Sequence, residues 1–497
     1  MSFKVGFIGA GSIGFTRKLV KDLLTVPEFS DVELMFMDIS KKNLDMVYQL
    51  VERDIKANGR DGVTLSGTLN QKEAVTDAKY VINCSRVGGI EAFQTDIDIP
   101  LRYGIDQCVG DTLCAGGIMY GQRGIAMIMN LCRDIKAAAR DDVMILNYGN
   151  PNAMLTWAAN HYGGVPTVGL CHGVQGGHKQ IAEVLGVPKD ELDIICAGIN
   201  HQTWYIKLQY KGEDMTGKLL AAYESDPELS RKERVRIDML KRFGYYSTES
   251  NGHLSEYVPW YRKRPEEINN WIAMDGWILG ETGGYLRVCT EKRNWFEEDF
   301  PQWMAEDPEK YDAESRSNEH GSYIIEGLET GRIYRGHFNV INNGTITNLP
   351  DDAVVEVPGY VDALGMNIPK VGDLPLGPAA VCNASISVQR MSVQAALNGD
   401  DFLLRQAMMM DPLTGAVCNP PEIWQMVDEL LVAQEQWLPQ YGEAIAAAKA
   451  RIADGLKIPV KEGYQGSARL EVKSVDELRQ QEGQTLNVEA KAFKFKK

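Results

Sequence analysis

The sequence lacks the features that mark membrane proteins and nucleic-acid-binding proteins. No apolar run approaches the roughly 18 to 20 residues that span a bilayer. Basic residues are outnumbered, with 52 Lys and Arg against 68 Asp and Glu and a formal net charge of −16. Such a surface disfavours binding to polyanions. We therefore expect no nucleic-acid partner and no membrane association.

Cysteine is sparse, and its spacing shows no pairing pattern. The 497 residues contain nine cysteines and no C-x-x-C pair. An odd number of scattered cysteines in a long chain indicates free thiols in a reducing compartment. The short apolar stretch at residues 5–8 could begin a signal peptide, but the glycines that follow it have a better use. We expect a cytoplasmic protein.

The first 150 residues alternate apolar runs with amphipathic segments. Short continuous apolar runs, typical of strands buried in a parallel sheet, occupy residues 3–8, 33–37, 80–83 and 143–146, and a further strand is expected at 165–170. Helical segments such as 41–58 and 121–138 separate them. The pattern predicts an α/β fold with a Rossmann-like, doubly wound parallel sheet, as in lactate and malate dehydrogenases.

The pattern changes at about residue 196 to mixed helix and strand. We expect a charged helix at 224–243, antiparallel strands at 334–358 around an Asn342-Asn343-Gly344 turn, and helices at about 390–409 and 421–437. Three units are predicted. They are an NAD-binding domain (1–195), an α+β substrate-binding and catalytic domain (196–441), and a C-terminal extension (442–497) that ends in Lys494-Phe495-Lys496-Lys497.

A dinucleotide-binding motif follows the first predicted strand. It matches G-x-G-x-x-G and opens a helix at residues 15–24, and it makes cofactor-binding candidates of Gly9, Gly11, Ser12, Ile13 and Gly14. Free N–H groups at the helix start stabilise phosphates. Asp38 ends the second strand, 24 residues after Gly14. A carboxylate there accepts hydrogen bonds from ribose hydroxyls and repels a 2′-phosphate, so we predict NAD rather than NADP.

Three short polar blocks hold residues with catalytic potential. They are LNYGNP (146–151), GLCHG (169–173) and GINH (198–201), and the first two follow predicted strands. A lone Cys is usually a small buried residue, and a lone His usually satisfies a hydrogen bond. If Cys171 and His201 share a metal ion, ligand softness favours zinc or iron over manganese.

These blocks resemble glycoside hydrolase family 4, the NAD-dependent and metal-dependent glycosidases. The resemblance extends from residue 3 to about 441 and is greatest to the α-galactosidase branch, which looks like GLCHSVQG at the Cys171 block. The matching stretches are GAGSIG (9–14), Asp111-Thr112 with Gly116-Gly117-Ile118, LNYGNP, GLCHGVQG (169–176), CAGINH (196–201), GYYSTES (244–250), GHLSEYVPW (252–260), MMDP (409–412) and WLP (437–439).

The resemblance implies an elimination–addition mechanism in place of the usual pair of glycosidase carboxylates. NAD would take a hydride from C3 of the sugar, a base would remove the C2 proton, and the glycosidic oxygen would leave from C1. Water would then add and the hydride would return. A divalent ion, Mn²⁺ in this family, would bind the 2- and 3-oxygens as a Lewis acid.

The resemblance also assigns catalytic and metal-binding roles. Cys171 and His201 would bind the metal, in spite of the softness argument. His172 would act as a general acid near the leaving oxygen. Tyr257 would be the base at C2, which requires a nearby metal or cation to lower its pKa from about 10. The alternative for Tyr257 is an ordinary aromatic core residue.

Further residues are expected around the sugar and the cofactor. Asn150 and His253 would contact the sugar, and Asn83 and Asn147 would lie along the cofactor. The run at 262–264 (RKR) is either a solvated charge run or, together with Arg287, a source of a cation for a carboxylate or sulfonate on the sugar.

We therefore predict an exo-acting, α-galactosidase-like enzyme with NAD and Mn²⁺ as cofactors, a small-molecule sugar as substrate, and a homodimeric or homotetrameric assembly. One alternative is the same mechanism on an anionic sugar, such as an α-galacturonide, an α-glucuronide or a sulfonated sugar. Others are an NAD-dependent 2-hydroxy acid dehydrogenase and a catalytically inactive NAD-sensing protein.

Overall fold

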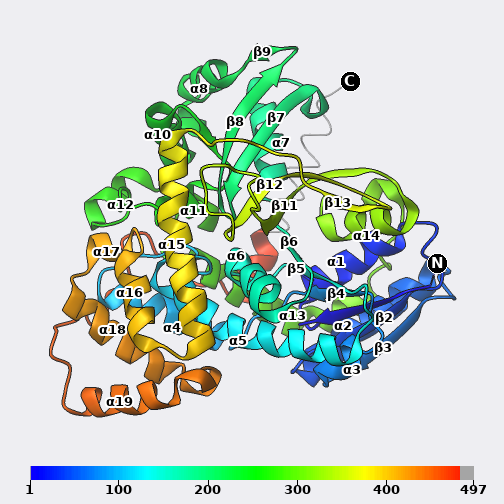
Figure 1. The fold of residues 1–497 in the computed structure, drawn as a ribbon, viewed down its shortest axis with the longest axis horizontal. Coiled ribbons are helices and arrows are strands. Elements are labelled where there is room, and N and C mark those ends of the chain that lie inside the picture. The colour runs from blue at the N-terminus through cyan, green and yellow to red at the C-terminus, as the bar shows by residue number, and fades with distance from the viewer. Residues whose placement is uncertain (1, 482–497) are drawn as a thin grey trace.

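One mixed β-sheet runs through the molecule (Figure 1). The structure is a computed structural model that describes residues 2–481, apart from the side chains of Ile13, Asn294 and Trp295. Within residues 2–481, the sheet has 13 strands in the order β10-β8-β7-β12-β11-β6-β5-β4-β1-β2-β3, with β9 and β13 pairing at its side.

The half of the sheet from β6 to β3 is parallel. Its order, β3-β2-β1-β4-β5-β6, is that of a dinucleotide-binding fold, so the predicted Rossmann-like fold is confirmed. The edge strand β3 was not predicted, because its TLSGT sequence is half exposed and only weakly apolar. The strands are β1 (Lys4–Ile8), β2 (Glu33–Met37), β3 (Thr64–Thr68), β4 (Tyr80–Asn83), β5 (Met144–Asn147) and β6 (Thr167–Gly169).

The other half of the sheet is antiparallel and continues directly from β6. Strand β11 joins the two halves through the pairing of Asn339 with Gly169, and β12 then pairs with β7. The strands are β7 (Leu192–Ile199), β8 (Gln202–Tyr210), β9 (Glu213–Asp214), β10 (Tyr246–Ser247), β11 (Tyr334–Ile341), β12 (Val354–Asp362) and β13 (Gly365–Asn367). Because the sheet is continuous, the domain division at residue 195 stays a prediction.

The predicted antiparallel pair at 334–358 is confirmed, but its turn is longer than expected. Residues 342–353 connect β11 to β12, so the connection continues beyond the predicted Asn342-Asn343-Gly344 turn. The Asn342 side chain donates to the carbonyls of Ile346 and Leu349, and its carbonyl oxygen accepts from the Ile346 N–H. These bonds close the longer loop.

Helices α1 to α7 accompany the parallel strands. They include the predicted helices at 15–24, 41–58 and 121–138, with somewhat different bounds. The helices are α1 (Ile13–Leu24), α2 (Lys41–Ala57), α3 (Gln71–Val75), α4 (Gly89–Arg102), α5 (Cys114–Ala138), α6 (Asn152–Trp157), η1 (Ala158–Gly163) and α7 (Gly173–Leu185), followed by the short turn η2 (Lys189–Glu191).

The remaining helices come later in the chain, and most lie around the antiparallel half or at the lower left of Figure 1, whereas α14 (His320–Thr330) packs beside α1. They are α8 (Thr216–Ser225), α9 (Pro227–Lys232), α10 (Arg234–Phe243), α11 (Asn251–Glu256), α12 (Pro265–Trp271), η3 (Trp277–Leu279), α13 (Gly284–Ala305), η4 (Ala313–Ser315), α14 (His320–Thr330), α15 (Leu376–Asn398), α16 (Asp401–Met410), α17 (Thr414–Val417), α18 (Pro420–Ala433), η5 (Glu435–Trp437), η6 (Pro439–Tyr441) and α19 (Gly442–Ala453).

Two helix predictions in this half are corrected. The segment 224–243 is three helices in succession, because Asp226 caps a new helix that starts at Pro227 and α10 starts again after Glu233. The segment 390–409 spans α15 and α16, which are separated at Gly399, a residue with φ of 64°. A left-handed glycine ends a helix at little cost, whereas a helix through this position would need a different backbone.

The core packs against both faces of the parallel sheet. Val5 and Phe7 lie in one buried cluster, whereas the neighbouring Ile8 lies in another together with Val81 and Ile145. Two buried faces explain why these strands are continuous apolar runs. No helix within residues 2–481 is both long enough and apolar enough to cross a membrane.

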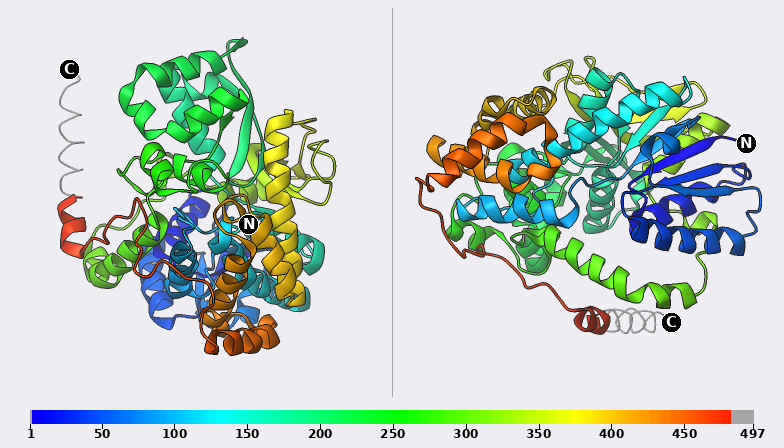
Figure 2. Two further views of the ribbon diagram at one scale, coloured as in Figure 1. Left: turned by 90° about the vertical axis from the view of Figure 1, so that its left-hand side faces the viewer. Right: turned by 90° about the horizontal axis from the view of Figure 1, so that it is seen from below.

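The described part of the C-terminal extension packs on its own chain. After α19, residues 455–481 run along the molecule beside α13 (Figure 2). The Lys473 N–H donates to Glu291, and Arg479 pairs with Asp299 of α13. These contacts hold residues 473 and 479 of the extension against α13 of the same chain. The Lys-rich end at 494–497 lies outside the described residues.

Candidate active site

The glycine-rich turn lies between β1 and α1, at the carboxyl end of the parallel strands. Gly9 has a φ of 85°, and a Cβ atom there would come within 2.7 Å of the Ser85 backbone, so this position requires glycine. At Gly11 a Cβ atom would lie 2.7 Å from an Asp38 oxygen. Ser12 precedes α1 without a side-chain cap, which leaves the helix N–H groups available to a ligand.

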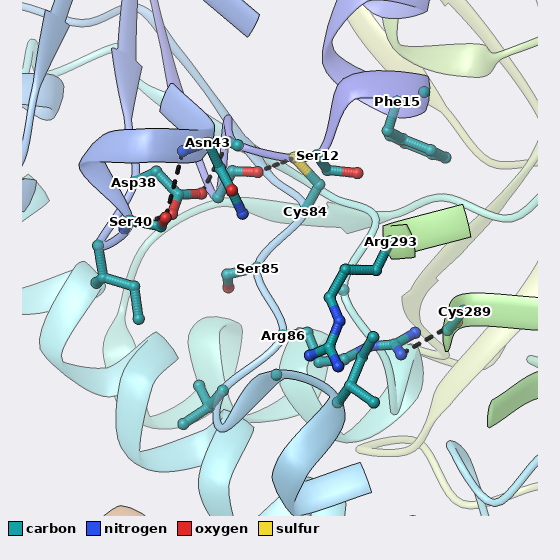
Figure 3. A pocket seen from close by; sticks show the side chains of 18 of the residues that line it. Ser12, Phe15, Asp38, Ser40, Asn43, Cys84, Ser85, Arg86, Cys289 and Arg293 are labelled. Atoms are coloured by element: carbon teal, nitrogen blue, oxygen red, sulfur yellow. Dashed lines mark hydrogen bonds between the residues drawn. The ribbon is translucent and has the colours of Figure 1, made fainter. Parts of the chain in front are cut away.

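Asp38 lies beside this turn, as predicted. Its Oδ2 accepts a hydrogen bond from the Gly11 N–H and its Oδ1 accepts one from the Ser40 N–H, both at 2.8 Å (Figure 3). Two backbone donors fix the carboxylate, and both of its oxygens keep further lone pairs. The side chain of Ile13, also a predicted cofactor-binding residue, is outside the described part of the structure.

Asn83 and Asn147 end two neighbouring strands and are completely buried. Asn83 donates to Asn147 at 2.8 Å, and its own carbonyl oxygen accepts from the hydroxyl of Ser85. Asn147 accepts from the Gly149 N–H. The pair therefore holds the loops that follow β4 and β5, and it supports the cavity wall from behind.

A cavity of about 2010 Å³ connects the glycine-rich turn to the first and second polar blocks, through Gly149 and Asn150 of the first and His172 of the second. At one side it is lined by Gly9, Gly11, Ser12, Gly14 and Asp38, which we call the glycine-rich end. Asn150 and His172 also line it. We call these two residues, with the adjoining Cys171, His201 and Glu249, the cluster end.

Three possible metal ligands meet at the cluster end. One ligand atom from each of Cys171, His201 and Glu249 lies within 4.8 Å of the others. Cys171 follows β6, His201 lies in the tight turn between β7 and β8 with φ of 62°, and Glu249 follows β10. The structure thus brings together the two predicted ligands and adds a third. Burial raises the pKa of Glu249, but the nearby His201 and His253 lower it by more, so that it lies below its usual value.

A chain of hydrogen bonds orients His201. The Thr112 hydroxyl is 2.8 Å from His201 Nδ1 and donates to Asp111, and Asp111 also accepts from the Asn150 amide at 2.8 Å. With Nδ1 in this bond, Nε2 is free to bind a metal ion. The predicted sugar contact Asn150 is therefore linked to a predicted metal ligand.

Two further histidines lie beside the cluster. The side chain of His172 is 69% exposed, and its Nδ1 is 3.8 Å from Glu319. His253 is buried 5.0 Å from the His201 ring, and its Nδ1 meets the Ser250 hydroxyl at 2.7 Å. Burial, opposed in part by Glu249, lowers the pKa of His253 to about 4. His253 is therefore neutral at pH 7, whereas His172 is open to the cavity.

Tyr257 lies behind His201 with its ring parallel to the imidazole, at an interplanar angle of 5° and a centroid distance of 6.4 Å. Its phenol oxygen is buried and has no hydrogen-bond partner among the described residues. Burial and then the charge of Asp111 raise the pKa of Tyr257 well above its usual value. A buried phenol without a partner costs free energy unless a ligand satisfies it.

The candidate cations for an acidic sugar are already paired. Arg262 is fully buried and pairs with Asp106, so it is not part of a solvated charge run. Arg287 donates one edge of its guanidinium to Glu281 and the other to Glu291. These contacts give it a structural role within its own helix and loop, and they leave no edge for a sugar.

Asp111 and Glu249 belong to the cluster end in the structure, but the sequence analysis did not predict them as site residues. Both lie in stretches that carry the family resemblance, Asp111-Thr112 and GYYSTES (244–250). An acidic residue in each stretch was the available indication. The sequence does not show that Glu249 lies beside Cys171, because the two residues are 78 positions apart in the chain.

Comparisons with known proteins agree with this geometry. The family described as "Family 4 glycosyl hydrolase" matches residues 4–187, and its C-terminal domain matches residues 196–414. The chain is 56% identical to an α-galactosidase of Rhizobium meliloti (strain 1021) over 479 residues, 96% of this chain and 97% of that one. It is 34% identical to an α-galactosidase of Bacillus subtilis (strain 168), with 88% and 99% covered.

A solved structure shows the same fold. It is a 6-phospho-α-glucosidase from gut microorganisms in complex with NAD and glucose-6-phosphate, which is 25% identical, covers 88% of this chain and 99% of its own, and has a TM-score of 0.73. Together with the family match over most of the chain, these findings show that this protein belongs to the family 4 glycosyl hydrolases.

Proposed function

We propose that the protein is an exo-acting α-galactosidase that releases galactose from small, unphosphorylated α-galactosides and uses NAD and Mn²⁺ as cofactors. The observation that carries the proposal is that one cavity contains both the glycine-rich end and the cluster end. His172 and Asn150 line the cavity that starts at the glycine-rich turn. His172 follows Cys171 in the chain, and Asn150 is linked to His201 through Asp111 and Thr112. Two relatives that match most of the chain bear the name α-galactosidase.

The glycine-rich end fits NAD. A Cβ atom at Gly9 or Gly11 would collide with Ser85 or Asp38, so the glycines allow the tight turn that a pyrophosphate-binding loop needs. The open start of α1 supplies N–H donors to the phosphates, and Asp38 accepts from ribose hydroxyls. The fixed negative charge of Asp38 disfavours the 2′-phosphate of NADP.

The cluster end fits a divalent ion. A thiolate and an imidazole alone favour zinc or iron, but the carboxylate of Glu249 adds an oxygen ligand of the kind that manganese prefers. With Glu249 as a third ligand, the donor atoms agree better with the manganese that the family resemblance implies. Thr112, Asp111 and Asn150 would keep the imidazole of His201 in the orientation that metal binding needs.

When bound, NAD supplies reversible hydride transfer at C3 and the metal ion supplies Lewis-acid stabilisation of the sugar's oxygens. Asn150 would hold the sugar by a hydrogen bond. Tyr257 would remove the C2 proton as a phenolate, after losing its own proton to solvent, and the charge of the bound metal ion would favour that loss. His172, which reaches the cavity, would donate a proton to the oxygen that leaves C1.

The assembly and the compartment follow the same proposal. A thiolate ligand at Cys171 is lost on oxidation, so the enzyme would work in a reducing compartment such as the cytoplasm.

We expect a homodimer or a homotetramer, which analytical ultracentrifugation would distinguish.

The test is an assay on a panel of aryl glycosides with Mn²⁺, NAD⁺ and a thiol reductant, each omitted in turn. We expect α-galactoside hydrolysis only with all three present and no net NADH at steady state. Hydrolysis that persists without both metal and NAD⁺ would contradict the mechanism. Net NADH production from a 2-hydroxy acid would favour the dehydrogenase alternative.

A further inference from the structure

Helix α13 forms one wall of the cavity. Its cavity-lining residues recur every three or four positions, so they share one face of the helix. They include Tyr285, Val288, Lys292, Phe296, Asp299 and Trp303. Figure 3 shows Asp38 and Ser40 across the cavity from Cys289 and Arg293 of α13. The cavity therefore lies between the carboxyl ends of the parallel strands and nearly the whole length of α13 (Gly284–Ala305).

The last described part of the chain, residues 467–481, lies on the other side of α13, and we call it the strap. In both views of Figure 2, α13 (light green) lies between the blue N-terminal strands and helices and this red segment. Just before α13 begins, Thr282 and Ala468 exchange two hydrogen bonds, at 2.9 and 3.2 Å. The Ser467 N–H donates to Asp106 at 3.1 Å. The strap is thus fixed where α13 starts.

Two further contacts tie the strap to α13 itself. The Lys473 N–H donates to Glu291 at 2.8 Å, and Arg479 pairs with Asp299 further along the helix. The Asp299 side chain is 3% exposed, whereas that of Arg479 is 46% exposed, and both residues line the cavity. A buried carboxylate is costly without its partner, so this pair favours the position in which the strap and α13 are in contact.

The structure shows α13 closed onto the parallel half of the sheet. Phe296 is 6% exposed and belongs to the same buried cluster as Phe7 of β1 and Phe36 of β2. Because the cavity lies between α13 and the parallel strands, a ligand on the glycine-rich turn would be covered by this helix. For such a ligand to enter or leave, α13 would have to move.

A covering helix of this kind suits a cofactor that is retained between turnovers. In the proposed reaction, the hydride taken from C3 of the sugar is returned to it, so one NAD molecule serves many cycles. A dehydrogenase with net turnover has to exchange its cofactor in every cycle. Slow opening of α13 at the cofactor would therefore not limit the rate of the proposed enzyme.

We propose that α13 is a lid over bound NAD⁺, that the strap holds this lid closed, and that Arg479 and Asp299 are positioning residues for the cofactor that act through α13. The inference rests on the proposed function, which supplies the identity of the cofactor. It gives the C-terminal extension a role, which is to keep NAD⁺ in its site between turnovers.

The test measures cofactor release and does not depend on turnover. NADH bound to the full-length enzyme with Mn²⁺ is displaced by excess NAD⁺ in a stopped-flow fluorimeter, which gives the dissociation rate. Arg479→Gln and Asp299→Asn should each raise this rate by about tenfold or more, because the loss of one member of a buried charge pair acts mainly on dissociation. The double variant should release NADH no faster than the faster single variant, since both changes break the same pair.

Arg451→Gln is the matched control. Arg451 of α19 also pairs with a carboxylate in the C-terminal part of the chain, that of Asp428 of α18 at 2.7 Å, but neither of these two described residues lines the cavity. The dissociation rate of this variant should stay within about twofold of the wild type. Thermal melting and Mn²⁺ binding, measured for every variant, show whether the fold and the cluster end are intact.

Hydrogen exchange on the wild type provides a second measurement that needs no variant. If the lid and the strap close together, NAD⁺ should slow exchange at the backbone amides of α13 and of the strap by about tenfold or more, because coupling between two sites is reciprocal. The Lys473 N–H, which donates to Glu291, is a specific probe of the strap.

Equal dissociation rates in the wild type and the two single variants would overturn the proposal, as would exchange in the strap that is unaffected by NAD⁺. Tighter cofactor binding in Asp299→Asn would also overturn it, because freeing Arg479 would then have strengthened a direct contact with the cofactor. If the wild type binds neither NADH nor NAD⁺, the proposed function itself fails and this inference fails with it. Cofactor binding with normal release in the variants overturns the inference alone.

Discussion

The two ends of the cavity differ in how completely the protein satisfies its own polar groups. At the glycine-rich end, both oxygens of Asp38 accept backbone hydrogen bonds, and Asn83 and Asn147 bond each other behind the wall. At the cluster end, the phenol of Tyr257 has no partner within the described residues. At the glycine-rich end the side chains are fixed by bonds within the chain and the backbone N–H groups at the start of α1 are open to a ligand. At the cluster end a buried side-chain hydroxyl is open to one. Changes at the two ends should therefore have separable effects.

The largest effect is expected from Cys171→Ala at the cluster end. It removes one of three metal ligands, so we expect α-galactosidase activity to fall by more than about 1,000-fold, because the metal supplies several kcal/mol of transition-state stabilisation. Titration of Mn²⁺ by electron paramagnetic resonance should show lost metal binding, while NAD⁺ affinity stays the same.

Cys84→Ala is the control at the glycine-rich end, because Cys84 lines the cavity and its thiol bonds to the backbone carbonyls of Ile8 and Gly9. Its Mn²⁺ binding should equal that of the wild type. Equal metal binding in the two variants would show that Cys171 is not a ligand.

The next effect is expected from Tyr257→Phe. If Tyr257 removes the C2 proton, kcat should fall by about 100-fold or more, with NAD⁺ and Mn²⁺ affinities unchanged. Because the phenol oxygen has no hydrogen-bond partner within residues 2–481, its removal should not lower the melting temperature. Loss of deuterium exchange at C2 of the bound sugar is the specific readout.

Tyr261→Phe is the matched control for this step. Tyr261 is also buried in the same segment, but its hydroxyl donates to Asp238 at 2.8 Å. We expect this variant to lose some stability and to keep its kcat. A normal exchange rate in Tyr257→Phe would assign the base to another group.

The contrast between the two ends also explains what the sequence could predict. The glycine-rich end is local, since G-x-G-x-x-G directly follows a strand and Asp38 ends the next one, and so its position was predicted correctly. The parallel strands were predicted for the same reason, because both faces are buried and each run is continuously apolar.

The residues of the cluster end come from distant segments of the chain, so the sequence pattern could not predict that they meet. Cys171, His201 and Glu249 come from three loops that only the mixed sheet brings together. The likeness to a family gave the first two and left Glu249 without a role. The sequence shows that an arginine is charged but does not show which carboxylate it pairs with. Arg287 was therefore predicted to bind the sugar, although the structure pairs it with Glu281 and Glu291.

A smaller effect is expected from Asp38→Ala at the glycine-rich end. Loss of the carboxylate should weaken NAD⁺ binding by about tenfold to a hundredfold, the range for one or two hydrogen bonds to a charged group. At saturating NAD⁺, kcat should be unchanged, since the cluster end is intact. Fluorescence titration gives the affinity, and the preference for NAD⁺ over NADP⁺ should shrink with it. A fall in kcat at saturation would mean that the ends are not separable.

The smallest effect concerns β11, the strand that joins the two halves of the sheet. His337 on this strand is 7% exposed, and burial, followed by the charges of His320 and Arg335, lowers its pKa to about 3. The unfolded chain takes up a proton near pH 6.5, whereas the folded chain does so only near 3. Between these values the unfolded state binds more protons. Stability should therefore fall as the pH drops, by about 1.4 kcal/mol per unit from this group.

Urea unfolding at pH 7 and pH 5.5 would measure this slope. We expect His337→Gln to be less sensitive to acid than the wild type by about 1.4 kcal/mol over this interval, because about one pH unit of it lies below the unfolded pKa. The exposed His161 provides the control, since His161→Gln removes a histidine from the surface and should leave the slope unchanged. If the slopes of the wild type and His337→Gln are equal, the acid sensitivity of the fold does not come from the strand that joins its halves.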